Sequence, residues 1–424
     1  MQENFLHYIW KYKKFNTPKL KTTTGEVVTL VKAGQHNRHS GPDFFDARMR
    51  IGGQLWAGNV EIHVKSSDWY LHSHENDPAY DNVILHVVYE DDVEVFRKDN
   101  TAIPALELKS FIDPSVLQGY QNLLHGKPKW IHCENEFADT DDFLLRNWTE
   151  RLYFERLEQK AQLIAEMLKS SKNDWEAVLF RLLAKNFGLK VNGDAFLSMA
   201  SSFDFPIVRK LQTDVLQLEA LFLGQSGILD QPIEDPHYQM LAKAYFFLKQ
   251  KFGISNFQVV KPQFFRLRPP NFPTIRLAQL AMLYHREQGL FSKVIGESSI
   301  EGFYSIFSIA PTAFWQNHYT FGKTSARTKK ALTHSFIDLL AINTLLPLKF
   351  CYAKHLGQDI DEEILNIVKK IVPEKNAIVD TFFSLKKGIK MSAMESQALI
   401  QLKTVYCNKS RCLDCAIGNA LLNA

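Results

Sequence analysis

The period of the hydrophobic pattern changes near residue 111, and this change constrains the fold more than any other feature. Before it, apolar residues alternate or form short β-branched runs, as they do in strands. After it, they recur every three to four residues between Gly, Pro and Asn, as they do in amphipathic helices. We therefore predict an α+β protein: an N-terminal mixed β-sheet domain with a flanking helix over residues 1–110, followed by a larger, mostly α-helical domain over residues 111–424.

The expected elements follow from these patterns. A short helix is predicted around residues 5–15, and Gly52-Gly53 predicts a tight hairpin between two strands. The expected strands are 26–32, 44–51, 54–65 and 83–89, with a further hairpin at 93–97 and 103–108. The expected helices are 141–170, 174–188, 206–224, 237–252, 273–290, 330–346, 359–371 and 392–404.

The strand 54–65 carries polar side chains on one of its faces. Because successive residues of a strand point to opposite faces, Glu61, His63 and Lys65 share one side. Counting outward from the Gly52-Gly53 turn places Asp43 near Ile62, within a residue or two of Glu61. The carboxylates of Asp43 and Glu61 are predicted to bind Mg²⁺ or Mn²⁺, with His63 or Lys65 orienting or deprotonating a water. The alternative is a solvated sheet face with cross-strand ion pairs.

Histidines are concentrated in the same region. His36, His39, His63, His72, His74 and His86 fall within 51 residues. His72, His74, Asp68 and His86 are therefore expected to hold a second metal or to support the first. A zinc hydrolase built on His63, His72 and His74 is the alternative, although no HExxH motif accompanies it.

The net charge of +4 hides an asymmetry along the chain. Residues 1–110 hold 13 Lys and Arg against 15 Asp and Glu, so the remaining residues carry 37 against 31, a net charge of +6. Residues 236–286 and 302–337 contain no acidic residue. The side chains predicted from these basic windows to bind nucleic acid are Arg266, Arg268, Arg276, Lys323 and Arg327. The alternative for the arginines is a joint between domains, in which they pair with acids of the first half.

Three of the five cysteines stand close together near the end of the chain. Cys407, Cys412 and Cys415 have the spacing C-x4-C-x2-C, which favours structural Zn²⁺ first and an iron–sulfur cluster second. The fourth ligand is expected from Cys133, His132, Cys351 or His355, and free thiols are the alternative. An odd number of cysteines fits a reducing compartment, and no apolar run of membrane-spanning length is recognised, so we expect a cytoplasmic protein that binds no membrane.

Two resemblances extend this interpretation. Pro42-Asp43, the hairpin, and Glu61-Ile-His63 with Lys65 resemble the PD-(D/E)xK nuclease core, which implies a restriction-endonuclease-like fold in which Asp and Glu bind metal and a lysine supports catalysis. Here His63 stands in the lysine position and Lys65 follows two residues later. Over nearly its full length the chain also resembles the bacterial family catalogued as domain of unknown function 2851. The stretches that carry this second resemblance are Ser40-Gly-Pro-Asp-Phe44, Gly58-Asn-Val-Glu-Ile-His63, His72-Ser-His74, Arg266-Leu-Arg-Pro-Pro-Asn-Phe-Pro-Thr-Ile-Arg276 and Tyr406-Cys407 through Gly418.

Two functional hypotheses follow from the sequence. The first is a Mg²⁺- or Mn²⁺-dependent nuclease whose basic helical half binds the nucleic acid. The second is a non-catalytic protein that binds nucleic acid or another partner and retains a degenerate nuclease-like site.

Overall fold

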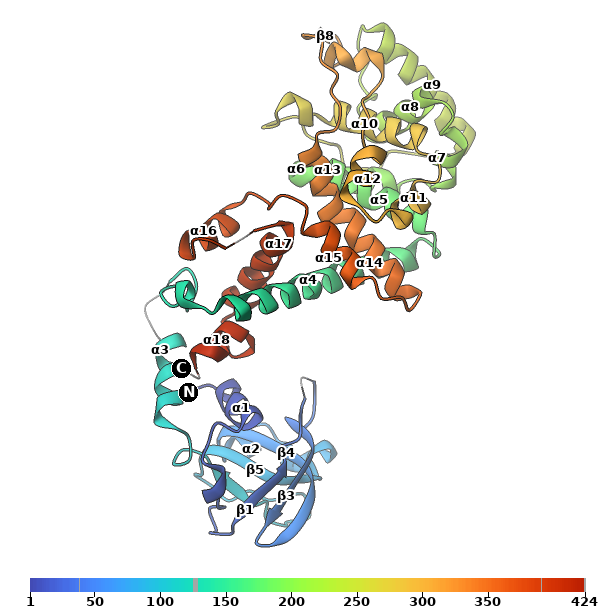
Figure 1. Cartoon of the computed structure of the whole chain (residues 1–424). Coiled ribbons are helices and arrows are strands. Elements are labelled where there is room, and N and C mark those ends of the chain that lie inside the picture. The colour runs from blue at the N-terminus through green and yellow to red at the C-terminus, as the bar shows by residue number, and fades with distance from the viewer. Residues whose placement is uncertain (38, 125–128, 390, 423–424) are drawn as a thin grey trace. The chain divides into compact units, whose positions relative to one another are not determined.

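The computed structural model describes residues 1–37, 39–124, 129–389 and 391–422. An N-terminal sheet region is followed by a larger helical region, so the predicted α+β class is confirmed (Figure 1). The chain forms two compact units: Met1–Trp148 with Phe382–Lys387 and Leu402–Ala424, and Thr149–Thr381 with Gly388–Gln401. We call them the sheet unit and the helical unit. The C-terminal cysteine segment belongs to the sheet unit, which a boundary at residue 110 does not anticipate.

The sheet unit is built on one mixed sheet. Its strands are β1 Val28–Lys32, β2 Gln35–His36, β3 Phe44–Ile51, β4 Gln54–Lys65, β5 Val83–Glu90 and β6 Ala105–Glu107. They lie in the order β1-β3-β4-β5-β6, with β2 also paired to β3. Strands β1, β3 and β4 are antiparallel, whereas β4, β5 and β6 are parallel. The predicted hairpin at 93–97 and 103–108 is present in part: Phe96 and Ala102 form an antiparallel bridge, and the Ile103 N–H donates to the Val95 carbonyl. The rest of its second arm forms β6, which pairs with β5 and buries Leu106.

The hairpin between β3 and β4 follows the predicted register only near its turn. The pairing runs as expected from Ile51–Gln54 to Ala47–Gly58 and then shifts by one residue, so that Phe44 lies opposite Val60. Asp46 takes a left-handed backbone conformation with φ 54° at this β-bulge, and its carboxylate pairs with Lys32 of β1. The extra residue on β3 moves Asp43 toward Glu61.

Strand β4 is buried on both faces over its second half. Val60 and Ile62 are fully buried, as are most residues of β5, which confirms that β5 is covered on both sides. Helix α1 (Glu3–Tyr12) packs on β4 through its apolar face and ends at Lys13 in the left-handed conformation. The crossover from β4 to β5 contains helix α2 (Asp68–Leu71) and two short 3₁₀ turns. Polar side chains of α1, β4, β5 and this crossover are thereby brought together.

The remaining elements are mostly helices. The 29-residue helix α4 (Asp142–Ser170) matches its prediction, whereas the predicted helix 206–224 is divided because Asp214 caps a new helix through Leu216 N and Gln217 N. The other helices are α3 Pro114–Leu124, α5 Trp175–Phe187, α6 Leu189–Ser201, α7 Pro206–Leu211, α8 Val215–Gln225, α9 Pro236–Phe252, α10 Pro273–Arg286, α11 Leu290–Gly296, α12 Ile300–Ile306, α13 His334–Leu340, α14 Leu346–His355, α15 Asp361–Val368, α16 Ala377–Leu385, α17 Ala393–Gln401 and α18 Ala416–Leu421. A small hairpin of β7 (His318–Thr320) and β8 (Lys323–Thr324) lies in the helical unit.

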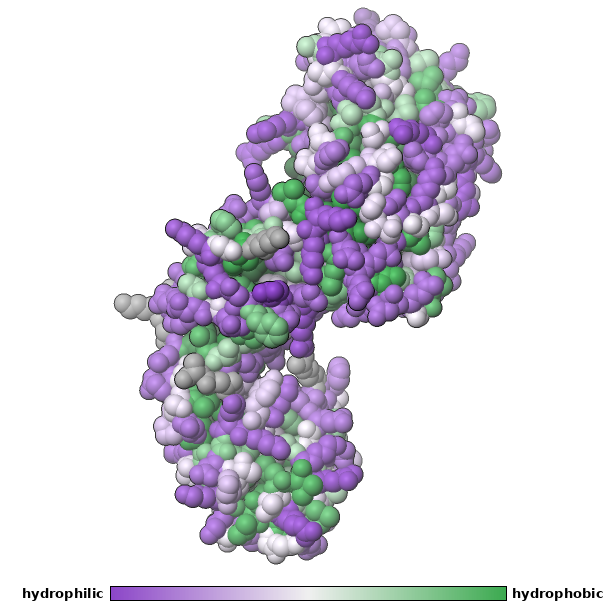
Figure 2. Space-filling view, viewed as in Figure 1, coloured by the Kyte–Doolittle hydropathy of each residue, from purple (hydrophilic) through white to green (hydrophobic). Residues whose placement is uncertain are grey.

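One helical stretch is long and apolar enough to span a membrane, which the sequence reading missed. It runs over His334–His355 and comprises α13, a π-helical turn at Ala341–Leu345 and α14. Most of it is buried inside the protein. The face of the molecule in Figure 2 is mostly hydrophilic, with scattered apolar residues. Burial in the core of the helical unit accounts for the apolar composition of this stretch.

The close packing of α8 on α9 gives a test of the helical unit. A methyl group at Gly224 would lie 2.1 Å from the Tyr245 ring. We therefore expect Gly224→Ala to lower the free energy of unfolding by about 1–3 kcal/mol, measured by chemical denaturation. Gly296 has no atom within 4 Å of the corresponding position, so Gly296→Ala should change stability by less than about 0.5 kcal/mol. Equal effects of the two substitutions would contradict this packing.

Candidate metal centre

Eight titratable side chains meet where α1, β3, β4, β5 and the β4–β5 crossover come together. Five of them form what we call the histidine cluster: Glu61 and His63 on β4, His72 and His74 on the crossover, and His86 on β5. The other three form what we call the α1 triad: Glu3 and His7 on α1, and Asp43 just before β3.

The β-bulge joins Asp43 directly to Glu61. The Asp43 backbone N–H donates to Glu61 Oε2 at 3.1 Å, and the Ile62 backbone N–H donates to Asp43 Oδ2 at 3.0 Å. Each carboxylate thus accepts a hydrogen bond from the backbone of the opposite strand. The predicted proximity of these two carboxylates is present, but it is produced by the bulge rather than by a regular ladder.

The histidine cluster is buried at its base and open at one side. Glu61 is 4% exposed and His63 is 1% exposed, which excludes the solvated sheet face as an explanation for these two residues. His63 Nδ1 lies 2.9 Å from His86 Nε2, and His63 Nε2 lies 3.2 Å from His72 Nδ1. Because His72 is exposed to solvent, the cluster is reachable from outside.

The crossover holds the other imidazole of the cluster in place by aromatic packing. The His74 ring stacks on Tyr80 with centroids 3.8 Å apart, and it meets the buried Trp69 edge-on. Its Nε2 lies 3.4 Å from Glu61 Oε1. Trp69 and Tyr80 form a small core with Val83 and neighbouring side chains, so the position of His74 depends on the packing of the crossover against β5.

Burial controls the charge of the cluster. Burial, together with the neighbouring His86, lowers the pKa of His63 to about 2, and burial lowers the pKa of His86 to about 3. Burial also raises the pKa of Glu61 to about 7, although its hydrogen bond with His74 acts in the opposite direction. His63 is therefore a neutral imidazole at neutral pH, which is the form that binds metals.

Three of the spacings among these ligand atoms are close to those found around one metal ion. Metal–ligand bonds of about 2.1 Å place ligand atoms about 3.4 Å apart in a tetrahedron. Glu61 Oε1 lies 3.5 Å from His63 Nε2 and 3.4 Å from His74 Nε2, and His63 Nε2 lies 3.2 Å from His72 Nδ1. One ligand atom from each of the three histidines lies within 4.8 Å of the others. His86 can accept the Nδ1 proton of His63, which would leave His63 Nε2 free for a metal.

The α1 triad was not recognised in the sequence. His7 Nε2 lies 3.1 Å from Asp43 Oδ2 and 3.6 Å from Glu3 Oε1. Burial alone would lower the pKa of His7, but the nearby carboxylates of Asp43 and Glu3 outweigh burial and raise this pKa to about 9. The one sequence signal was Glu3 and His7 four residues apart on a helix, which places both on one face.

Two residues predicted for this site lie outside it. The Lys65 side chain is 52% exposed and its Nζ lies 3.9 Å from Asp92 Oδ2. Asp68 Oδ2 accepts a hydrogen bond from the Lys65 backbone N–H, which fixes the start of α2. Neither side chain reaches the histidine cluster, because β4 ends at Lys65 and the chain turns there into the crossover.

The predicted nucleic-acid-binding residues divide into exposed and buried groups. Arg266, Arg268, Lys323 and Arg327 are exposed. Arg276 is only 8% exposed; its guanidinium donates to Asn271 and Gln279 and lies 3.7 Å from the centre of the Phe336 ring. Burial lowers the pKa of Arg276 to about 10. Arg276 is therefore a packing residue of the helical unit, because α10 turns its side chain inward.

The basic residues that remain exposed lie on two segments that pack together. Thr274 Oγ1 donates to the Tyr319 carbonyl at 2.5 Å, and Gln279 Nε2 donates to the Lys330 carbonyl at 2.8 Å. These bonds join the loop and helix that follow Arg266 to the β7–β8 segment.

The three C-terminal cysteines lie in the sheet unit together with Cys133, whereas Cys351 and His355 belong to the helical unit.

Comparison with known proteins identifies a family. A family model described as protein of unknown function (DUF2851) matches residues 3–377. Searches of curated proteins and of solved structures gave no match. The match carries no assigned activity, so the function has to be inferred from the side chains described above.

The α1 triad predicts a pH dependence of stability. A pKa raised from 6.5 to about 9 means that the stabilising contribution of His7 is complete below pH 6.5 and is lost as the pH rises through 9. In the presence of a chelator, the wild type should be more stable than His7→Gln at pH 6, and this difference should shrink by about 1–3 kcal/mol at pH 10. Urea denaturation of both proteins at the two pH values measures this difference in the free energy of unfolding. His39→Gln, at an exposed position, is the control, and a difference that is constant or grows with pH would contradict the assignment.

Proposed function

The chain belongs to the DUF2851 family, and we propose that it is a metal-dependent phosphodiesterase that cleaves nucleic acid. The observation that carries the proposal is the grouping of one nitrogen from each of His63, His72 and His74 within 4.8 Å, with Glu61 Oε1 lying 3.5 Å from His63 Nε2 and 3.4 Å from His74 Nε2. These distances suit one metal ion. Glu61 and His63 are buried whereas His72 is exposed, so a substrate could reach a metal bound there.

The ligand set favours a transition metal. Three imidazole nitrogens and one carboxylate oxygen suit Zn²⁺ or Mn²⁺, whereas Mg²⁺ prefers oxygen ligands alone. The sequence pointed to Asp43 and Glu61 as ligands of Mg²⁺ or Mn²⁺. In the structure Asp43 already accepts from the Ile62 backbone and pairs with His7. We therefore assign Asp43 to the support of the site and Glu61 to the metal.

The side chains around this site have distinct roles in the proposed reaction. A metal held by these four residues would need a fifth coordination position for water; there it would lower the pKa of that water and neutralise charge on the phosphate. His86 would hold His63 in the ligating tautomer, and Trp69 and Tyr80 would hold His74. The α1 triad would hold the Asp43 carboxylate in place through His7. Lys65 has no part in this arrangement, because its side chain points toward Asp92.

The order of the elements supports a restriction-endonuclease-like core. A helix is followed by an antiparallel hairpin, and a strand parallel to the second hairpin strand comes next. Asp43 and Glu61 stand at adjacent positions of that hairpin, as the resemblance to the PD-(D/E)xK core implies. We propose that this chain uses histidine ligands where that core uses a lysine. The histidines would make the site prefer Zn²⁺ or Mn²⁺ to Mg²⁺.

The exposed cations of the helical unit support a polyanionic substrate. Arg266, Arg268, Lys323 and Arg327 are exposed on the segments joined through Thr274 and Gln279. Exposed arginine and lysine side chains neutralise phosphates and release counterions. The aromatic residues Phe264 and Phe265 are exposed beside Arg266 and could stack on bases.

Cleavage assays test the reaction. We expect the wild type to cleave single- or double-stranded DNA or RNA when supplied with Mn²⁺ or Zn²⁺ and to be inactive after chelation. His72→Ala, at an exposed position that tolerates substitution, should lower metal affinity at least about 10-fold and cleavage about 100-fold. Lys65→Met should retain activity, because Lys65 lies outside the cluster.

Other outcomes of the same assay would separate the alternatives. Loss of activity in Lys65→Met with little effect of His72→Ala would restore the lysine-dependent mechanism. Metal-loaded wild type that binds nucleic acid without cleaving it would overturn the enzyme proposal and favour a non-catalytic binding protein.

Salt dependence tests the basic surface. Replacing Arg266 and Arg268 together by Gln should weaken nucleic-acid binding and reduce the slope of log affinity against log salt by about 1 to 2. Arg209→Gln is the matched control, because Arg209 is part-exposed in the same unit but already pairs with Glu176. Binding by the wild type that does not change with salt would contradict phosphate recognition.

A further inference from the structure

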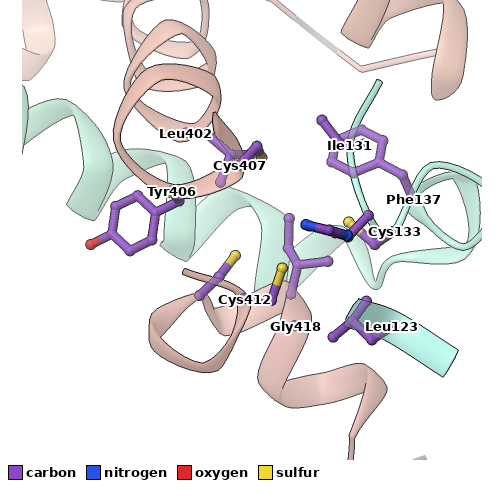
Figure 3. Close-up of a pocket in the computed structure, with 12 residues that line it drawn as sticks. Leu123, Ile131, Cys133, Phe137, Leu402, Tyr406, Cys407, Cys412 and Gly418 are labelled. Atoms are coloured by element: carbon purple, nitrogen blue, oxygen red, sulfur yellow. The ribbon is translucent and has the colours of Figure 1, made fainter. Parts of the chain in front are cut away.

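The structure brings a fourth cysteine to the three at the end of the chain. Cys133, Cys407, Cys412 and Cys415 line one small cavity in the sheet unit. Figure 3 shows Cys133, Cys407 and Cys412 around this cavity, on segments far apart in the sequence. None of the five cysteines forms a disulfide.

Other contacts hold the two cysteine segments together. His132 Nε2 lies 3.0 Å from Ser410 Oγ, and Lys403 Nζ donates to the Trp130 carbonyl at 2.6 Å. The residue next to Cys133 is thus tied to the loop between Cys407 and Cys412. These bonds fix Cys133 beside the C-x4-C-x2-C segment without any help from the thiols.

Without a cation, the four thiols that line this cavity stay protonated. Its wall is otherwise mostly apolar and includes Leu123, Ile131, Phe137, Leu402 and Ile417. Burial raises the pKa of Cys133 and Cys412 to about 12, and burial also raises those of Cys407 and Cys415. A cation is needed to make this group of sulfurs anionic, and thiolates are strong ligands for soft metals.

Donor groups near one of these sulfurs act against burial. Burial raises the pKa of Cys415, whereas the backbone N–H groups of Ile417 and Gly418 and the side chain of Trp148 lower it and so favour the thiolate. Donors to a buried sulfur are the surroundings that stabilise a metal-bound thiolate. This feature is independent of the spacing of the cysteines.

We propose that Cys133, Cys407, Cys412 and Cys415 together hold one metal centre through four thiolates. The centre is received ready-made from a metal or iron–sulfur donor: each thiol loses its proton to solvent and replaces one donor ligand on the metal, so no electron is transferred. A single Zn²⁺ with bonds of about 2.3 Å would draw the sulfurs to about 3.8 Å from one another and leave no cavity between them. Among the described residues no three of these sulfurs lie within 4.8 Å of one another, which is a wider spread than one Zn²⁺ holds and favours the larger [4Fe–4S] cluster as the occupant.

Metal analysis of the full-length chain tests the proposal. The protein is purified without oxygen in the His72→Ala background, so that metal at the histidine cluster does not contribute. We expect about four iron atoms and four acid-labile sulfides per chain, with visible charge-transfer absorption. Cys133→Ser and Cys412→Ser should each lose most of the iron and the absorption. Cys351→Ser is the matched control and should keep both, because Cys351 is buried elsewhere and donates to the Ala161 carbonyl.

Each other result decides a part of the proposal. One zinc per chain that is lost in Cys133→Ser would support the four-thiolate centre and overturn the cluster. Full metal content in Cys133→Ser would overturn the role of Cys133. Absence of zinc and iron from the wild type would overturn the centre itself. If Cys133→Ser is insoluble, the analysis of the wild type and of Cys407→Ser, at a less buried position, decides the question.

Discussion

The exchange of hydrogen bonds between Asp43 and Glu61 is the interaction on which the candidate site depends. Each carboxylate accepts a hydrogen bond from the backbone of the opposing strand. These two bonds hold β3 and β4 together where the register of the hairpin shifts. The buried carboxylate of Glu61 is costly unless its oxygens are satisfied. Its second oxygen faces His63 and His74. The bulge therefore creates the polar interior that the histidines complete.

The sheet unit combines two groups of potential ligands with different chemistry. The histidine cluster offers nitrogen and oxygen atoms and is open to solvent at His72, as a reacting site requires. The four cysteines offer only sulfur in a mostly apolar cavity, as a structural or electron-carrying centre requires. The difference in ligand softness keeps the two sites selective for different metals. The cysteines would also join distant parts of the chain, because Cys133 and Cys407 come from opposite ends of the sheet unit's sequence.

The sequence predicted those helices and strands well whose formation depends on residues adjacent in the chain. Gly52-Gly53 and the alternation around it define β3 and β4, and the apolar run at 83–89 defines β5. The pair His72 and His74 and the C-x4-C-x2-C segment were recognised from their spacing alone. The bulge was not, because its cause is the left-handed Asp46 and its ion pair with Lys32 on another strand. Arg276 was misplaced on the surface, because only packing decides which side of α10 faces Phe336.

What the sequence by itself determined is the kind of structure and the kinds of ligand: strands before helices, a carboxylate and imidazoles on one strand, and three thiols near the end. These properties depend on periodicity and spacing over a few residues, which short-range sterics and burial enforce. The tertiary structure alone decided which side chains meet. It added Glu3 and His7 from α1, removed Lys65 from the site, and selected Cys133 as the fourth thiol. Those choices depend on the crossover, the bulge and the packing of distant segments, for which no local pattern in one sequence provides a signal.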